Sequence, residues 1–164
     1  MDLLNLIGLR IKDIKYNYIY ENEYGMQEFY SYIKLSNGLI FMIPYYPDEE
    51  VVENKALKEA FNKAKKVNID FLKKLKDKHI VNFHFPYFEN ELNEGRKSYV
   101  ELGGSIFLTE MNSGPPGITN VDMHLYTRLE FENEKGNLED GFQIIPLTDI
   151  IRNKKQKCSN NEMK

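Results

Sequence analysis

Histidine and aspartate are the residues in this 164-residue chain whose types and spacing come nearest to a reaction centre. The histidines stand at positions 79, 84 and 124. Asp122 and His124 belong to a run that alternates between polar and apolar residues, so both side chains are predicted on one face of a strand. That face could hold a metal ion or an acid–base pair. His84 and Asn82 could join it if the strand predicted at 80–85 lies beside this one.

The competing interpretation is that these residues are ordinary polar positions on a solvated sheet face, which alternation alone predicts. The chain lacks the HExxH and CxxC spacings of common zinc sites. Ser105 has no GxSxG around it, Cys158 lies in a polar tail, and no glycine-rich phosphate loop is present. We therefore predict no catalytic residue, metal site or cofactor. A metal-dependent hydrolase that uses Asp122 and His124 is kept as an alternative.

A lysine-rich segment at residues 55–78 could follow a phosphate backbone. It holds nine lysines against three acids, but it contains no arginine, the residue best suited to bidentate phosphate contacts. Most of the aromatic residues that could stack on bases lie instead in the acidic parts of the chain. A solvated helix face explains the lysines as well, so a nucleic-acid-binding accessory protein is a second alternative.

Tyrosine supplies the clearest indication of a binding surface, because it joins a large apolar body to a polar tip and is enriched at interface hot spots. Two tyrosines lie on the polar face of the strand predicted at 27–35. The polar face of the strand at 121–131 carries further aromatic and ionisable residues, and two prolines stiffen the loop at 112–120. The predicted partner surface consists of Tyr30, Tyr32, Asp122, His124, Tyr126, Glu130, Pro115 and Pro116. The competing interpretation is that the tyrosines cover a second core face and the loop is a structural turn.

The elements that must position these residues are mostly strands. Alternating or β-rich runs predict strands at residues 9–20, 27–35, 39–45, 80–85, 98–102, 105–111, 121–131 and 142–147. Asn37-Gly38 and Gly103-Gly104 indicate two hairpins. Helical segments are predicted at 53–67 and 71–78, either as one bent helix or as two helices with Asp70 as the N-cap of the second. The chain is therefore interpreted as one α+β domain at 1–152, a twisted and mostly antiparallel sheet with the 53–78 helical layer on one face, followed by a disordered basic tail at 153–164.

Charge is strongly segregated along the chain, although the formal net charge is only -3. Residues 55–79 are basic, whereas residues 80–147 hold 11 acids against four bases. No run approaches the roughly 18–20 apolar residues that cross a bilayer, and the first residues lack the features of a signal peptide. A lone cysteine cannot form an intramolecular disulfide. We therefore expect a cytoplasmic protein that does not enter the membrane.

The segments IKLSNGLIFMIP at 33–44 and LGGSIFLTEMNSGPPGITNVDMHLYTRLEF at 102–131 share a pattern of hairpin, strand, Gly/Pro loop and strand. In that pattern the chain resembles small bacterial proteins of the kind found beside polymorphic toxins as immunity proteins. The resemblance implies a compact α+β protein that binds and blocks a cognate toxin. It assigns no role to any individual residue.

The leading hypothesis is a non-enzymatic protein-binding module that inhibits a basic protein such as a nuclease toxin. It follows from acidic β segments with tyrosines predicted on their exposed faces and from the missing catalytic motifs. An acidic surface would accelerate encounter with a cationic partner. The sequence defines neither the partner nor the oligomeric state.

Overall fold

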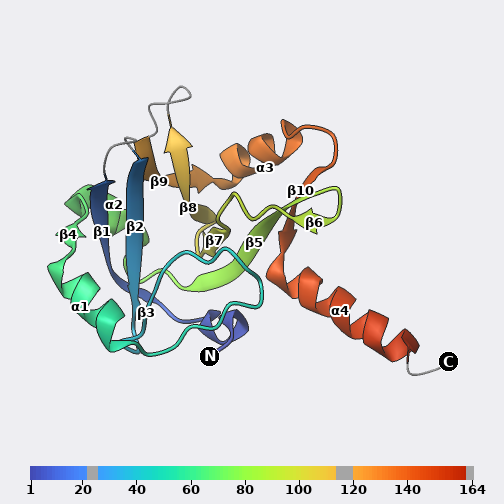
Figure 1. The fold of residues 1–164 in the computed structure, drawn as a ribbon, viewed down its shortest axis with the longest axis horizontal. Coiled ribbons are helices and arrows are strands. Elements are labelled where there is room, and N and C mark those ends of the chain that lie inside the picture. The colour runs from blue at the N-terminus through green and yellow to red at the C-terminus, as the bar shows by residue number, and fades with distance from the viewer. Residues whose placement is uncertain (22–25, 114–119, 162–164) are drawn as a thin grey trace.

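Two antiparallel sheets and four α-helices make up the part of the chain that the computed structural model describes, residues 1–21, 26–113 and 120–161 (Figure 1). The predicted α+β class is confirmed. The strands divide into two sheets that share one core, where a single sheet was expected. The chain opens with a 3-10 turn, Leu3–Leu6, whose two buried leucines join that core.

The smaller sheet has the strand order β3-β2-β1-β4. Its strands are β1 (Ile11–Glu21), β2 (Met26–Leu35), β3 (Ile40–Phe41) and β4 (Lys65–Lys66). The hairpin predicted at Asn37-Gly38 joins β2 to β3. Its loop has three residues: the Gly38 N–H donates to the Leu35 carbonyl at 2.9 Å, and Gly38 takes a φ of +86°. A type I turn followed by a left-handed glycine therefore replaces the expected two-residue turn.

The larger sheet has the order β10-β5-β7-β8-β9, with the short β6 paired to β5. Its strands are β5 (Ile80–Phe88), β6 (Glu91–Leu92), β7 (Tyr99–Leu102), β8 (Ile106–Ser113), β9 (Asn120–Thr127) and β10 (Phe142–Pro146). The second predicted hairpin, at Gly103-Gly104, joins β7 to β8. Strand β5 continues through Pro86, which was expected to end it.

The main core lies between the two sheets. Ile14 and Ile33 from the small sheet pack with Leu108 and Met123 from the large one. The ring of Phe41 on β3 meets the ring of Phe83 on β5 edge to face, with the centroids 6.3 Å apart. Apolar residues from both sheets thus bury one another, and each sheet keeps an outer face for a helix.

The predicted helical layer is two short helices, α1 (Lys55–Lys63) and α2 (Ile69–Leu75), separated by β4. Asn54 caps α1 by accepting from the backbone N–H groups of the next turn. Asn68, not Asp70, caps α2. Phe61 of α1 packs with Tyr32 and Ile40, so α1 covers the outer face of the small sheet as expected.

Helix α3 (Arg128–Gly136) replaces the second half of the strand predicted at 121–131. Thr127 and Glu130 form a capping box, in which each side chain accepts a hydrogen bond from the other residue's backbone N–H. The apolar period continues to Phe131, but Thr127-Arg128-Leu129-Glu130 has the spacing of a helix start. Phe131 then inserts from α3 onto the outer face of the large sheet.

Helix α4 (Leu147–Asn161) follows β10 directly and extends away from the rest of the molecule (Figure 1). Leu147 and Ile150 anchor it in the main core, whereas residues 152–159 are exposed. A tail without regular structure was expected from residue 153, yet the helix continues to Asn161. Among the described residues no helix is long and apolar enough to span a bilayer.

Replacing Thr127 by alanine tests the start of α3. Thr127→Ala removes the acceptor for the Glu130 N–H and should lower the free energy of unfolding by about 1 kcal/mol. Thr127→Ser keeps the capping oxygen and should stay close to the wild type. Urea unfolding measures both, and equal stabilities of the two variants would contradict the capping box.

Candidate functional site

Tyr30 and Tyr32, the two tyrosines of the predicted partner surface, lie on the side of β2 that helix α1 covers. Tyr32 is 6% exposed and packs with Ile40 and Phe61, and Tyr30 lies beside the same cluster. The expectation that they stand on an open sheet face is wrong for Tyr32, because α1 covers this side of β2. Burial, and to a smaller degree the Glu110 carboxylate, raises the pKa of Tyr32.

Asp122, His124 and Tyr126 lie on β9, in a different sheet from these tyrosines, and Glu130 lies in the first turn of α3. Asp122 is exposed and its carboxylate accepts from the Met123 N–H at 2.8 Å. The rings of His124 and Tyr126 stack with centroids 6.4 Å apart, and Glu130 is held in the capping box. Pro115 and Pro116 fall outside the described residues. The eight residues therefore do not form one surface in the part that the structure describes.

The condition for a shared site of His84 with Asp122 and His124 is not met, because β7 and β8 separate β5 from β9. Among the described residues no three His, Cys, Asp or Glu side chains converge as metal ligands would. His84 has a different carboxylate partner. It lies on the outer face of the large sheet, beneath α3.

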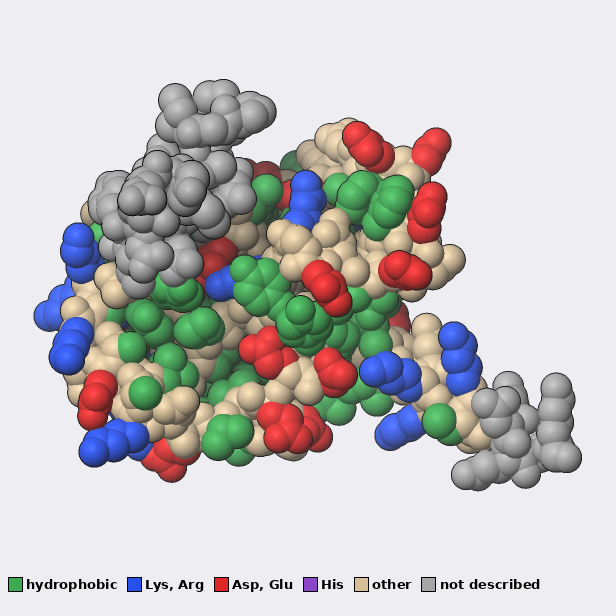
Figure 2. Space-filling view, viewed as in Figure 1, with side chains coloured by type: hydrophobic (Ala, Val, Ile, Leu, Met, Phe, Trp, Pro, Cys, Tyr) green, Lys and Arg blue, Asp and Glu red, His purple; other side chains and the backbone are tan. Residues whose placement is uncertain are grey.

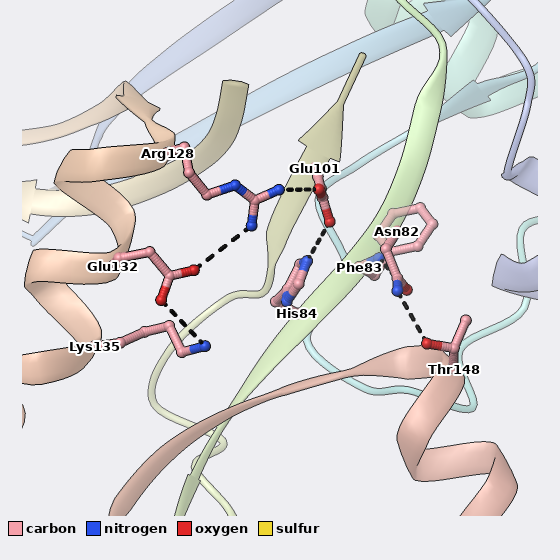
Figure 3. A network of polar contacts seen from close by, with 8 residues as sticks. All are labelled: Asn82, Phe83, His84, Glu101, Arg128, Glu132, Lys135 and Thr148. Atoms are coloured by element: carbon pink, nitrogen blue, oxygen red, sulfur yellow. Dashed lines mark hydrogen bonds and ion pairs between the residues drawn. The ribbon is translucent and has the colours of Figure 1, made fainter. Parts of the chain in front are cut away.

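A polar network links His84, Glu101 and Arg128 across β5, β7 and α3 (Figure 3). The His84 Nε2 is 2.7 Å from the Glu101 Oε2, and the Arg128 guanidinium lies 2.6 Å from the Glu101 Oε1. Arg128 also lies 3.6 Å from Glu132, one turn further along α3. Because the sheet pairs Asn82 with Glu101 and His84 with Tyr99, the register itself brings His84 close to Glu101.

Aromatic rings enclose the His84 imidazole. The rings of Phe107 and Phe131 lie edge to face with it, with centroids 5.5 and 5.3 Å away, and stack on each other at 3.9 Å. Burial lowers the pKa of His84, against the opposing effect of the Glu101 carboxylate, and the nearby cations Lys135 and Arg128 lower it further. The imidazole is therefore kept neutral in the folded protein.

A neutral histidine beside a carboxylate is the arrangement of a general base and its orienting group. The Glu101 carboxylate accepts the Nε2 proton, which leaves Nδ1 as the free acceptor. That Nδ1 is buried and has no hydrogen-bond partner among the described residues. A base must reach its substrate, so this enclosed network is better suited to fixing α3 on the sheet than to proton transfer.

A second polar cluster lies on the same face. The Tyr99 hydroxyl donates to the Glu134 carboxylate at 2.6 Å, and the rings of Tyr99 and Tyr126 meet edge to face at 6.0 Å. Burial, then the Glu134 charge and hydrogen bond, raises the pKa of Tyr126 to about 12. The Tyr99 hydroxyl thus donates to α3, whereas the Tyr126 hydroxyl donates to the Met111 Sδ on β8.

The most deeply buried ion pair joins the two sheets through the core. The Lys97 Nζ is 2.5 Å from the Glu110 Oε2, and the two side chains are only 7% and 3% exposed. The other Glu110 oxygen accepts from the Ser31 N–H at 3.1 Å and from its hydroxyl. Ser31 belongs to β2 and Glu110 to β8, so one carboxylate holds both sheets.

An exposed aromatic pair marks the other end of the large sheet. Phe88 is 40% exposed and its ring lies 4.7 Å from that of Phe142, with the Arg96 guanidinium 5.9 Å from the Phe142 centroid. We call this end the acidic tip, because the chain turns around the pair carry exposed acids, namely Glu89, Glu91, Glu94, Glu139 and Asp140. In Figure 2 acidic side chains gather around α3 and along the lower edge of the molecule, and basic side chains lie on the α1 side and on the projecting α4.

The turn of the acidic tip has a fixed conformation. Glu89 and Asn90 take φ values of 48° and 68° between paired residues of β5 and β6, the geometry of a two-residue type I′ turn. The Glu89 N–H donates to the Gly141 carbonyl at 2.9 Å, which joins the two acidic turns. A side chain at Gly141 would come within 3.3 Å of the Phe88 ring.

Sequence reasoning missed the network, the interior ion pair and the acidic tip. Glu110 carried a signal: it shares the alternation of Ile106 and Leu108, so it is a charged residue on an apolar strand face. Glu101 and Arg128 carried no such signal, since their meeting depends on strand order. The polar run at 89–97 predicts only a loop, which gave no indication of the acidic tip.

Removing one member of the interior pair should be costly, because the other charge stays buried. We expect Glu110→Ala to lower the free energy of unfolding by about 3–5 kcal/mol, and Glu110→Leu with Lys97→Met to recover most of this loss. Glu53→Ala, which removes the exposed partner of Lys58, is the matched control and should change little. Chemical denaturation measures all three, and a small effect of Glu110→Ala would contradict a closed interior pair.

The free energy of unfolding should depend on pH through His84. The pKa of His84 is lowered in the folded protein. As the pH falls, the unfolded chain therefore protonates His84 at a higher pH than the folded protein does. The contribution of His84 to the free energy of unfolding is thus complete only above about pH 6.5. Stability should fall as the pH decreases from there toward the folded pKa. His84→Gln removes this contribution, and its unfolding free energy should change less between about pH 8 and about pH 5.5. Parallel pH profiles of variant and wild type would contradict the assignment.

Comparisons with protein-family models, curated proteins and solved structures found no match to this chain. The resemblance to immunity proteins therefore stays a prediction. Function has to be inferred from the contacts and charges of the chain itself.

Proposed function

We propose that the protein is a non-enzymatic binding module that captures a basic protein partner, with the acidic tip as its docking surface. In its more specific form, the proposal is that the partner is a basic toxin and that binding blocks it. The cytoplasmic location expected from the sequence is part of the same proposal.

The observation that carries the proposal is the exposed Phe88 at the end of β5, beside the Glu89-Asn90 turn. Aromatic residues at the centre of an interface contribute most of the binding energy when a polar rim surrounds them. The Phe142 ring packs against the Phe88 ring, so less side-chain entropy would be lost when Phe88 binds a partner. The acids around it provide the rim.

The charge distribution supports a basic partner. Five exposed acids face a single exposed cation, Arg96, at the acidic tip. The electric field of an acidic surface attracts cationic partners and raises the rate at which they associate. The same field repels anionic partners. The enclosed state of His84 also supports a binding role, because its one free nitrogen does not reach the surface.

The lysine-rich face gives less support to nucleic-acid binding. Its lysines are exposed on α1, β4 and α2, but Phe61, the ring beside which Lys15 and Lys34 lie, is only 4% exposed. A buried ring cannot stack on a base. The lysine-rich face therefore supports nucleic-acid binding less well than the acidic tip supports a basic protein partner.

Two matched double variants test the acidic tip. Phe88→Ser with Glu91→Lys changes an apolar residue and an acid within it. Val52→Ser with Glu53→Lys makes the same change at an exposed apolar residue and acid elsewhere. The probes are the proteins encoded by the two reading frames that flank this gene, and calorimetry measures their binding.

We expect one of these proteins to be basic and to bind the wild type and the Val52/Glu53 variant equally. The Phe88/Glu91 variant should bind at least about tenfold more weakly, a loss of about 1.4 kcal/mol. Equal binding by all three proteins would exclude the acidic tip as the docking surface. Absence of binding to either product would overturn the toxin-inhibitor form of the proposal.

A further inference from the structure

Strand β10 forms one edge of the large sheet. Within the described residues its only strand partner is β5, which it pairs from Phe142↔Phe88 to Pro146↔His84. An edge strand presents backbone N–H and C=O groups that no neighbour satisfies, and such groups can accept a further strand.

The register shows which groups these are. The Glu89 N–H donates to the Gly141 carbonyl, one residue before the first pair, so residues 141, 143 and 145 direct their backbone groups toward β5. Pro86, opposite Ile144, has no N–H and offers its carbonyl to the Asn93 N–H at 2.9 Å on its other side. The N–H and C=O of Ile144 therefore point away from β5, toward the free edge.

A groove of about 460 Å³ runs along this edge. Its floor is β10, one wall is formed by Lys135 and Leu138 at the end of α3, and the other by Asp149 and Asn153 of α4. The volume falls in the range of roughly 300–1,000 Å³ that is common for ligand sites. In Figure 1, β10 lies between α3 and α4.

Both faces of β10 are already covered. The Ile144 side chain packs with Phe131 in the cluster under α3, and Ile145 packs against the main core that holds Ile150 of α4. Gln143 is exposed, but at Ile144 and Ile145 the edge is the open side, and an edge offers hydrogen bonds in the plane of the sheet. The groove is thus suited to an extended chain and not to a helix, which satisfies its own backbone.

We propose that this groove receives an extended segment of the partner protein as an added strand, hydrogen-bonded to the N–H and C=O of Ile144. Alternate side chains of the segment would contact Leu138 on one wall and Asp149 on the other, so the segment alternates apolar with polar or basic residues. The inference rests on the proposed function, since its occupant is part of the bound protein, and it adds the form in which that protein is held. The groove adjoins the acidic tip through Phe142, which belongs to both.

A second copy of this chain fits the edge less well. Antiparallel pairing of two β10 edges would bring the walls of both grooves, and both projecting α4 helices, into the space beside one strand. A single peptide strand needs only the room between one pair of walls. Self-association is therefore the outcome that competes with the proposal.

The free protein provides the first test. Amide exchange by NMR should show protected N–H groups at Gln143 and Ile145 and fast exchange at Ile144. Protection of all three in a monomer would overturn the assignment of a free edge.

The second test uses a phage-displayed library of random seven-residue peptides as the probe. We expect the wild type to select peptides that alternate apolar with polar or basic residues, and the bound peptide to slow exchange of the Ile144 N–H. Ile144→Pro removes that N–H and should weaken binding at least tenfold. Its matched control, Ile144→Val, shortens the side chain but keeps the N–H and should bind. Thermal unfolding of both variants shows whether they fold.

The third test uses a pair of variants in α4 and leaves the sequence of β10 unchanged. Asn153→Trp fills the groove from the exposed wall of α4 and should block the peptide, whereas Asn153→Ala should not. No peptide selection by the wild type, or equal binding by Asn153→Trp and the wild type, would overturn the proposal. A wild-type dimer in sedimentation that Asn153→Trp converts to a monomer would also overturn it, since a second copy would then cover the edge.

The two proposals fail in distinguishable ways. If the Phe88/Glu91 variant no longer binds the partner while Asn153→Trp still does, the acidic tip is supported as the docking surface and the groove is excluded. If Asn153→Trp no longer binds the partner while the Phe88/Glu91 variant still does, the groove is supported as the binding site and the acidic tip is excluded.

Discussion

The buried pair of Lys97 and Glu110 is the constraint on which the arrangement of the two sheets depends. Removing two charges from water is expensive, and only close pairing with further hydrogen bonds offsets that cost. Glu110 obtains them from Lys97 on one oxygen and from Ser31 on the other. A shift of β2 by one residue would direct Ser31 to the outer face and leave the carboxylate unsatisfied. Apolar contacts alone would tolerate more sliding, so the pair selects one alignment of the sheets.

The Lys97–Glu110 pair fixes the inner faces of the two sheets, and a different helix covers the outer face of each sheet. Helix α1 closes the small sheet through Phe61, and α3 closes the large sheet through Phe131. The network of His84, Glu101 and Arg128 belongs to that second closure, since Arg128 opens α3 and Glu101 lies on β7. Side chains of catalytic type are thus used to attach a helix. Exposed large apolar side chains occur in several parts of the described chain, and on the large sheet they include Phe88 at the end of β5.

Local signals made much of this fold predictable. Asn37-Gly38 and Gly103-Gly104 located both hairpins, because few residues take positive φ without strain. Period-two alternation gave β2 and β9, but it continued past Thr127 into a helix, where the capping box overrides it. The exposure of Tyr32 depended on where α1 lies, and the division into two sheets depended on strand order. Both are long-range properties that no local pattern encodes, and for the same reason the predicted partner surface was assembled from residues that do not meet.

The four sheet edges show why β10 is the one to consider for binding. Proteins discourage unwanted pairing by making edge strands short or charged. Strand β3 has two residues, β4 is Lys65-Lys66, and β9 carries Asp122. Strand β10, Phe-Gln-Ile-Ile-Pro, has no charge and only a terminal proline, and a groove lies along its free side. Strand β10 thus combines an uncharged edge with an adjoining groove, and the two walls of the groove limit a partner there to a single extended strand.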